Sequence, residues 1–127
     1  MKNILYRNEI EIRKSPLHGY GVFAKEDIMS GEILEECHYT KLSLKDLNNF
    51  DSSYTYWWDE NKDDKPRKPH DFRAFVFGYA SIYNSVDNIK DKMVKYYTDK
   101  KNNLFIFEAV KDIKKDQEIL SWYMKEK

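Results

Sequence analysis

The chain has 127 residues, which suits one domain and is too short for two ordinary ones. Lysine plus arginine number 22 and aspartate plus glutamate number 22, so the basic excess typical of nucleic-acid-binding proteins is missing. The single cysteine, Cys37, cannot form a disulfide within the chain, and no apolar run is long enough for a signal peptide or a membrane span. We therefore expect a soluble intracellular protein, cytoplasmic or nuclear, without direct nucleic-acid or membrane partners.

Short β-strands are predicted along the first half of the chain. Residues 9–13 alternate polar and apolar side chains, which predicts a half-buried strand, and the proline and the glycine of residues 15–19 predict a turn. Residues 21–24 and 32–40 predict the next two strands, with a break between them. A helical turn is predicted over residues 43–49, with Ser43 as its N-cap.

The second half continues this pattern. Residues 54–58 are aromatic and favour a strand, whereas residues 61–71 are charged, contain two prolines and predict a surface loop. Residues 74–83 are apolar and fit either a helix or a buried strand. Basic residues gather in residues 90–101, which predicts a solvated loop face. Two more strands, at residues 104–109 and 118–122, complete a compact, mostly β domain.

Three segments carry a family resemblance when they are taken together. The first is the Gly19-Tyr20-Gly21 turn between two strands, followed by a glycine-glutamate pair. The second runs from residue 78 to 88 and contains Asn84, and the third runs from residue 106 to the closing Tyr123. In this order and at these spacings, they resemble the SET-domain family of protein-lysine methyltransferases over about residues 10–123.

The resemblance implies a fold and a domain organisation. It implies a mostly β SET-domain (β-clip) fold of several short sheets with little helix, in which a C-terminal segment is threaded through to form the active site. Residues 1–127 would form a single SET domain without a pre-SET or post-SET module. In its brevity the chain is similar to the short chlorella-virus histone lysine methyltransferase.

The resemblance also implies an activity, namely methyl transfer from S-adenosylmethionine to the side-chain amine of a lysine. The substrate would be a lysine-containing tail or loop of a protein such as a histone. Transfer from a sulfonium to an amine is an in-line displacement, so the protein must hold both groups on one axis. Because some short relatives dimerise, a homodimer is left open.

Specific residues inherit roles from the resemblance. Tyr123 matches the closing tyrosine, whose hydroxyl lies beside the methyl group and the target nitrogen, and Tyr56 resembles a tyrosine that walls the lysine channel. A surface tyrosine and an ordinary core aromatic are the respective alternatives. Ser121 stands where many relatives carry phenylalanine or tyrosine, which leaves more room in the channel. The residues expected to bind the cofactor, for some of which a plain turn is the alternative, are His18, Gly19, Tyr20, Gly21, Asn84 and Ser85.

The second segment departs from the family pattern. Ser85 stands where histidine is usual, Val86 replaces serine, and Ile89-Lys90 replaces proline-asparagine. In the family the backbone of this segment makes much of the contact with adenine, so we expect weakened rather than abolished cofactor binding, at about 0.5–1.5 kcal/mol for each lost side-chain bond. The alternative is a catalytically silent SET domain that binds a protein partner or the cofactor without turnover. No metal site is expected, because the three histidines and Cys37 show no metal-ligand spacing.

Overall fold

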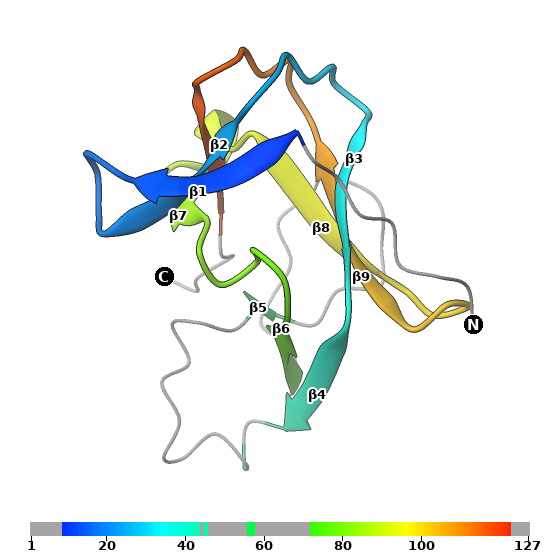
Figure 1. Ribbon diagram of the computed structural model, residues 1–127. Coiled ribbons are helices and arrows are strands. Elements are labelled where there is room, and N and C mark those ends of the chain that lie inside the picture. The colour runs from blue at the N-terminus through cyan, green and yellow to red at the C-terminus, as the bar shows by residue number, and fades with distance from the viewer. Residues whose placement is uncertain (1–8, 44, 46–55, 58–71, 123–127) are drawn as a thin grey trace.

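The computed structural model describes residues 9–43, 45, 56–57 and 72–122, and all structural statements below concern these residues (Figure 1). They form three small sheets and one short 3₁₀ helix, η3 (Ile89–Asp91). The expected mostly β architecture of several small sheets is confirmed. The predicted threading of the C-terminal segment remains a prediction. No helix in the described part of the chain is long and apolar enough to cross a membrane.

The first sheet has the strand order β1–β2–β10–β7. The hairpin formed by its first two strands aligns Ile10 with Ala24 at one end and Lys14 with Tyr20 at the other. The last strand of the chain pairs antiparallel with β2 and parallel with β7. Strands predicted at residues 9–13, 21–24 and 118–122 are thereby confirmed, and the observed bounds are β1 (Ile10–Lys14), β2 (Tyr20–Ala24), β7 (Asn84–Ser85) and β10 (Glu118–Ser121).

The second sheet has the order β3–β9–β8 and lies at the centre of Figure 1. The strand predicted at residues 104–109 is confirmed, but the solvated loop predicted over residues 90–101 is wrong. Val94, Tyr96 and Thr98 are buried there, because β-branched and aromatic side chains pack well in a sheet and outweigh the neighbouring lysines. The strand bounds are β3 (Ile33–Cys37), β8 (Val94–Asp99) and β9 (Leu104–Ala109).

The third sheet has the order β4–β6–β5, and it shows that the single strand predicted over residues 32–40 is wrong. That stretch divides at His38, whose carbonyl accepts a hydrogen bond from the Phe77 amide (2.9 Å), and its two parts pair in different sheets. Ser43 ends a strand, pairing with Phe72; most of the helical turn predicted after it lies outside the described residues. The bounds are β4 (Tyr39–Ser43), β5 (Tyr56–Trp57) and β6 (Phe72–Val76).

The structure also shows whether the apolar segment at residues 74–83 is a helix or a strand. Its first residues belong to β6, and the chain then turns at Gly78, whose φ is +90°. The Ile82 amide donates to the Tyr79 carbonyl (2.9 Å), which closes a turn before β7 begins at Asn84. The segment is therefore a buried strand followed by a turn. Of the other predictions, the loop at residues 61–71 and residues 54, 55 and 58 of the aromatic strand lie outside the described residues.

Aromatic side chains from the second sheet, the third sheet and the turn before β7 share the core. The buried ring of Tyr56 lies 4.7 Å from that of Tyr96 and 5.3 Å from that of Phe107, both in edge-to-face arrangements. Tyr83 lies 5.3 Å from the same phenylalanine. Such pairs contribute about 0.5–1.5 kcal/mol each beyond their buried area. This packing fixes β5 and the residue before Asn84 against the central sheet.

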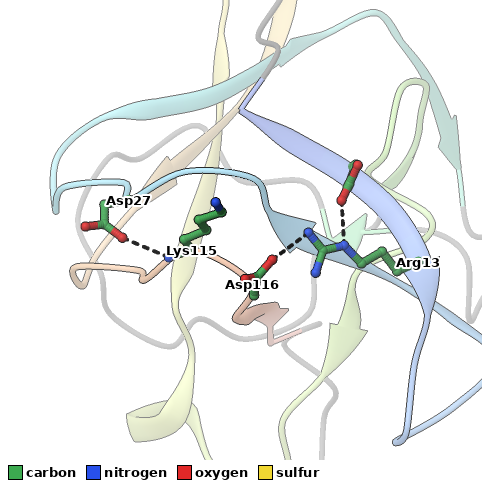
Figure 2. A network of polar contacts seen from close by, with 5 residues as sticks. Arg13, Asp27, Lys115 and Asp116 are labelled. Atoms are coloured by element: carbon green, nitrogen blue, oxygen red, sulfur yellow. Dashed lines mark hydrogen bonds and ion pairs between the residues drawn. The ribbon is translucent and has the colours of Figure 1, made fainter.

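A polar network on the surface fixes the start of β10 (Figure 2). The Arg13 guanidinium on β1 contacts Glu11 and donates to Asp116 Oδ1 (2.9 Å), in the turn directly before β10. The Lys115 amide of the same turn donates to Asp27 Oδ1 (2.9 Å). These contacts hold the 114–117 turn against the β1–β2 hairpin, and thereby set where Glu118 enters the first sheet.

Candidate cofactor site

Asn84 is the first residue of β7 and lies beside both the β1–β2 turn and β10. Its Nδ2 donates to the carbonyls of His18 (3.0 Å) and Tyr20 (3.2 Å) and to Glu118 Oε2 (2.8 Å). The parallel pairing of Asn84 with Leu120 places it beside β10. The structure therefore brings the hairpin turn and the asparagine segment together, although they are far apart in the sequence.

The turn at residues 15–19 leaves its tip open. The Ser15 amide donates to the Gly19 carbonyl (2.8 Å), and Gly19 has a φ of +47°, which glycine adopts without strain. In the described part of the chain, no atom other than those of Gly19 and its two chain neighbours lies within 4 Å of the point where a Cβ on Gly19 would stand. Leu17 and Tyr20 expose 63% and 69% of their surfaces. A ligand can therefore approach the backbone of this tip.

Gly21 has a different role in the turn. A Cβ at this position would overlap the Glu118 carboxylate and come within 3.1 Å of Asn84 Nδ2. The space that the missing side chain leaves is used by the protein's own carboxylate. Gly21 thus permits the bond between Asn84 and Glu118, and its contribution to a ligand site is through that bond.

Glu118 is a site residue that the sequence reasoning missed. Its Oε1 accepts from the Ser15 hydroxyl (2.7 Å) and its Oε2 from Asn84 Nδ2, so both carboxylate oxygens are used. An ionised carboxylate is an acceptor at both oxygens and suits this arrangement. The only sequence signal for Glu118 is its place in the third segment of the family resemblance, and that segment does not indicate which groups its carboxylate contacts.

Ser85 lies at the exposed end of the same short strand. Its hydroxyl donates to the carbonyl of Val86 (3.1 Å), the next residue along the chain. The Val86 amide in turn donates to the Ser121 carbonyl (2.8 Å), so the backbone of this segment is held by β10. The Ser85 side chain thus bonds locally, and its role in cofactor binding remains a prediction.

The structure describes only one of the two residues predicted to be catalytic. Tyr123 lies outside the described residues. Tyr56 is fully buried, and its hydroxyl donates to the Ala80 carbonyl (2.6 Å) in the turn before Asn84. Its role as a wall of a lysine channel remains a prediction. Ser121 is also fully buried, and its hydroxyl has no hydrogen-bond partner in the described part of the chain.

A partly buried carboxylate on the second sheet supports the same turn and was also missed. Glu35 accepts from the Tyr79 amide (2.8 Å), the Tyr83 hydroxyl (2.7 Å) and, more weakly, the Cys37 thiol (3.6 Å). Burial raises the pKa of Glu35, and the bonds from Tyr79 and Tyr83 offset part of that rise. No sequence signal separates this glutamate from the other acidic residues of its strand.

Comparison with known proteins identifies the family. The SET-domain family profile matches residues 19–124. The chain therefore belongs to the SET-domain family, as the three segments implied. The narrower similarity to the chlorella-virus enzyme remains a prediction. No curated protein sequence matches the chain at a significant level.

Solved structures agree with this assignment. A crystal structure of a candidate histone methyltransferase from Plasmodium falciparum is 28% identical, with a TM-score of 0.66, and the match covers 93% of this chain and 95% of that one. The methyltransferase domain of human PR domain-containing protein 2 is 15% identical (TM-score 0.65; 95% and 80% covered). CpSET8 from Cryptosporidium is 16% identical (TM-score 0.68; 93% and 58% covered). The last two show the fold alone.

Proposed function

We propose that this protein transfers a methyl group from S-adenosylmethionine to the side-chain amine of a lysine in a protein substrate. Membership of the SET family and the methyltransferases among its structural neighbours support protein methyl transfer in general. The observation that carries the finer proposal is the set of bonds from Asn84 to the hairpin turn and to Glu118. These bonds join the three segments of the family resemblance at one place.

The chemistry of the hairpin tip fits the cofactor. S-adenosylmethionine carries a sulfonium and an ammonium, both cationic. The carbonyl oxygens of His18 and Tyr20 and the Glu118 carboxylate gather around Asn84, so this part of the surface favours positive charge. The open space at Gly19 and the exposed ring of Tyr20 offer room and a flat apolar surface beside it. We assign His18, Gly19, Tyr20, Gly21, Asn84 and Ser85 to cofactor binding.

The bound cofactor would supply an electrophilic methyl group, and the chain would have to orient and deprotonate the lysine. Desolvation and a nearby cation both lower the pKa of a lysine amine, so no separate strong base is required. We assign the orienting hydroxyl to Tyr123 and a wall of the channel to Tyr56. Many relatives carry phenylalanine or tyrosine at the position of Ser121, and we assign to this smaller side chain the admission of an amine that already carries a methyl group.

Calorimetric titration with S-adenosylhomocysteine tests cofactor binding, and a lysine-peptide library with radiolabelled cofactor tests transfer. We expect saturable 1:1 binding and incorporation of label into lysine-containing peptides, which acid hydrolysis should recover as methyl-lysine. The absence of binding at millimolar ligand would contradict the proposal. Label recovered on a residue other than lysine would contradict its substrate class.

One observation favours a second candidate, a SET domain that binds a partner or the cofactor without turnover. The hydroxyl of Ser85, where the family usually has histidine, bonds to the adjacent Val86 carbonyl. The side chain at this position is therefore occupied locally. Binding of S-adenosylhomocysteine together with no transfer to any peptide of the library would favour this candidate.

A further inference from the structure

Glu35 belongs to β3, in a different sheet from Asn84, yet it contacts the turn that leads into Asn84. Its Oε1 accepts from the Tyr79 amide at the start of that turn (2.8 Å). Its Oε2 accepts from the hydroxyl of Tyr83, the residue directly before Asn84 (2.7 Å). One carboxylate therefore holds both ends of the segment 79–83.

The turn is packed closely against this carboxylate. Gly78 has a φ of +90°, and a Cβ there would lie 2.7 Å from Glu35 Oε1, so a side chain would displace the contact. Tyr83 is 1% exposed and its ring packs on Phe107, so the ring has little freedom to move. A change at Glu35 is therefore transmitted along the chain to the next residue, Asn84.

We propose that Glu35 is a positioning residue, whose carboxylate fixes the places of Asn84 and Ser85 through Tyr79 and Tyr83. The proposal rests on the proposed function in so far as Asn84 and Ser85 bind the cofactor. Glu35 contacts the turn at Tyr79 and Tyr83 and acts on Asn84 and Ser85 through this turn.

The energetics of the site support this role. Among the described residues, Glu35 accepts hydrogen bonds from the Tyr79 amide, the Tyr83 hydroxyl and the Cys37 thiol, and none of these three groups is a cation. Desolvation penalises the charged form of this partly buried carboxylate, which reduces stability at neutral pH even though the carboxylate accepts hydrogen bonds. Residues that reduce stability but organise a site, as Glu35 does, are typical of functional positions.

The test compares Glu35→Gln with Glu36→Gln, the same substitution one residue along the same strand. The glutamine can still accept from the Tyr79 amide, but its NH₂ group cannot accept from the Tyr83 hydroxyl, so that bond must either break or reverse its direction. Tyr83→Phe is the second variant, because it removes the same bond and keeps the ring. The readouts are the ¹H–¹⁵N spectrum of the ligand-free protein, the affinity for S-adenosylhomocysteine, and the Tm.

We expect Glu35→Gln and Tyr83→Phe to shift the Asn84 side-chain amide and the Ser85 backbone amide, and Glu36→Gln to leave both in place. Binding should weaken about fivefold in each of the first two variants, the effect of one lost hydrogen bond. The double variant should be no weaker than Glu35→Gln, since both changes remove one interaction. The Tm of Glu35→Gln should not fall.

Equal spectra at Asn84 and Ser85 for Glu35→Gln and Glu36→Gln would overturn the positioning role, whatever the ligand does. A lower Tm with unchanged affinity would also overturn it, because Glu35 would then be structural. If the wild type binds no S-adenosylhomocysteine while the Asn84 amide still responds to Glu35→Gln, the proposed function fails and the positioning role stands.

Discussion

The side-chain amide of Asn84 lies 2.8 Å from the carboxylate of Glu118, and this bond crosses from β7 to β10. The other oxygen of the same carboxylate accepts from Ser15, which stands 103 positions earlier than Glu118. One ionised side chain thus joins the opening turn, the asparagine segment and the closing strand. The geometry of the candidate cofactor site depends on this bond as much as on the backbone pairing.

Asn84→Ala should weaken binding of S-adenosylhomocysteine about tenfold, because the hairpin tip loses its donor to the His18 and Tyr20 carbonyls. Asn84→Asp should weaken binding further at neutral pH, since the new carboxylate would face Glu118. Lowering the pH should restore part of that affinity, because two adjacent carboxylates share a proton readily. Calorimetry at two pH values checks this. Wild-type affinity in Asn84→Ala would show that the segment is wrongly assigned.

Gly21→Ala should destabilise the protein by about 1–3 kcal/mol, the usual cost of overpacking, because its methyl group would overlap Glu118. Gly19→Ala should cost about 1 kcal/mol, since space is open there and only the positive φ is unfavourable. Urea unfolding measures both. Adding Glu118→Ala should recover part of the loss in Gly21→Ala and none in Gly19→Ala. Equal costs in the two glycine variants would argue against the overlap.

Ser85→His should leave the affinity for S-adenosylhomocysteine unchanged or increase it, because it restores the usual family residue at an exposed position. Ser85→Ala is the matched control and should change the affinity little, since the Ser85 hydroxyl bonds only to Val86 in the described part of the chain. Calorimetric titration of the wild type, Ser85→His and Ser85→Ala with S-adenosylhomocysteine under identical conditions measures these affinities. A marked loss of affinity in Ser85→Ala would mean that this hydroxyl itself contacts the ligand.

Tyr123→Phe should reduce methyl transfer at least tenfold, equivalent to about 1.4 kcal/mol of transition-state stabilisation, and leave cofactor affinity near the wild-type value. The substitution keeps the ring and removes only the hydroxyl. Single-turnover transfer to a lysine peptide is the appropriate measurement. A full rate in Tyr123→Phe would assign this tyrosine a structural role.

The raised pKa of Glu35 predicts a pH dependence of stability with a definite sign. The folded state holds the Glu35 proton more tightly than the unfolded state, so its contribution to the free energy of unfolding falls as the pH rises through the raised pKa. Glu35→Gln removes this fall. From about pH 4 to about pH 8, the stability of Glu35→Gln relative to wild type should therefore increase. A constant difference across that range would place Glu35 in an exposed environment in solution.

Local patterns account for the elements that the sequence predicted correctly. The strands of the β1–β2 hairpin and β9 either alternate polar and apolar residues or are rich in residues that favour β-structure. Glycine and proline delimit the turn between β1 and β2. β8 was missed because its lysines suggested a solvated loop, whereas Val94, Tyr96 and Tyr97 are buried against β9. The division at His38 follows from pairing with two different partner strands, which the residues of that stretch do not encode by themselves.

The candidate site, like the fold, could be predicted only in part from the sequence. The neighbourhood of Asn84 and the hairpin turn followed from the family resemblance. The acceptors Glu118 and Glu35 did not, because each acts on residues brought near by tertiary structure, at separations of 34 positions for Glu118 and Asn84 and 48 for Glu35 and Tyr83. Surface and buried glutamates are indistinguishable in a single sequence until their surroundings are known.

The position of β10 between β2 and β7 also determines when the site can exist. A ribosome completes residues 20–24 long before residues 118–121, so β2 has only β1 as a neighbour while most of the chain is still being made. Pairings between such distant segments close slowly, and an unpaired strand edge invites association with other chains meanwhile. The Asn84–Glu118 bond forms only after the closing strand emerges. A partly synthesised chain would therefore lack a complete first sheet and the Asn84–Glu118 bond, so the candidate cofactor site could be organised only once residues 118–121 have been made.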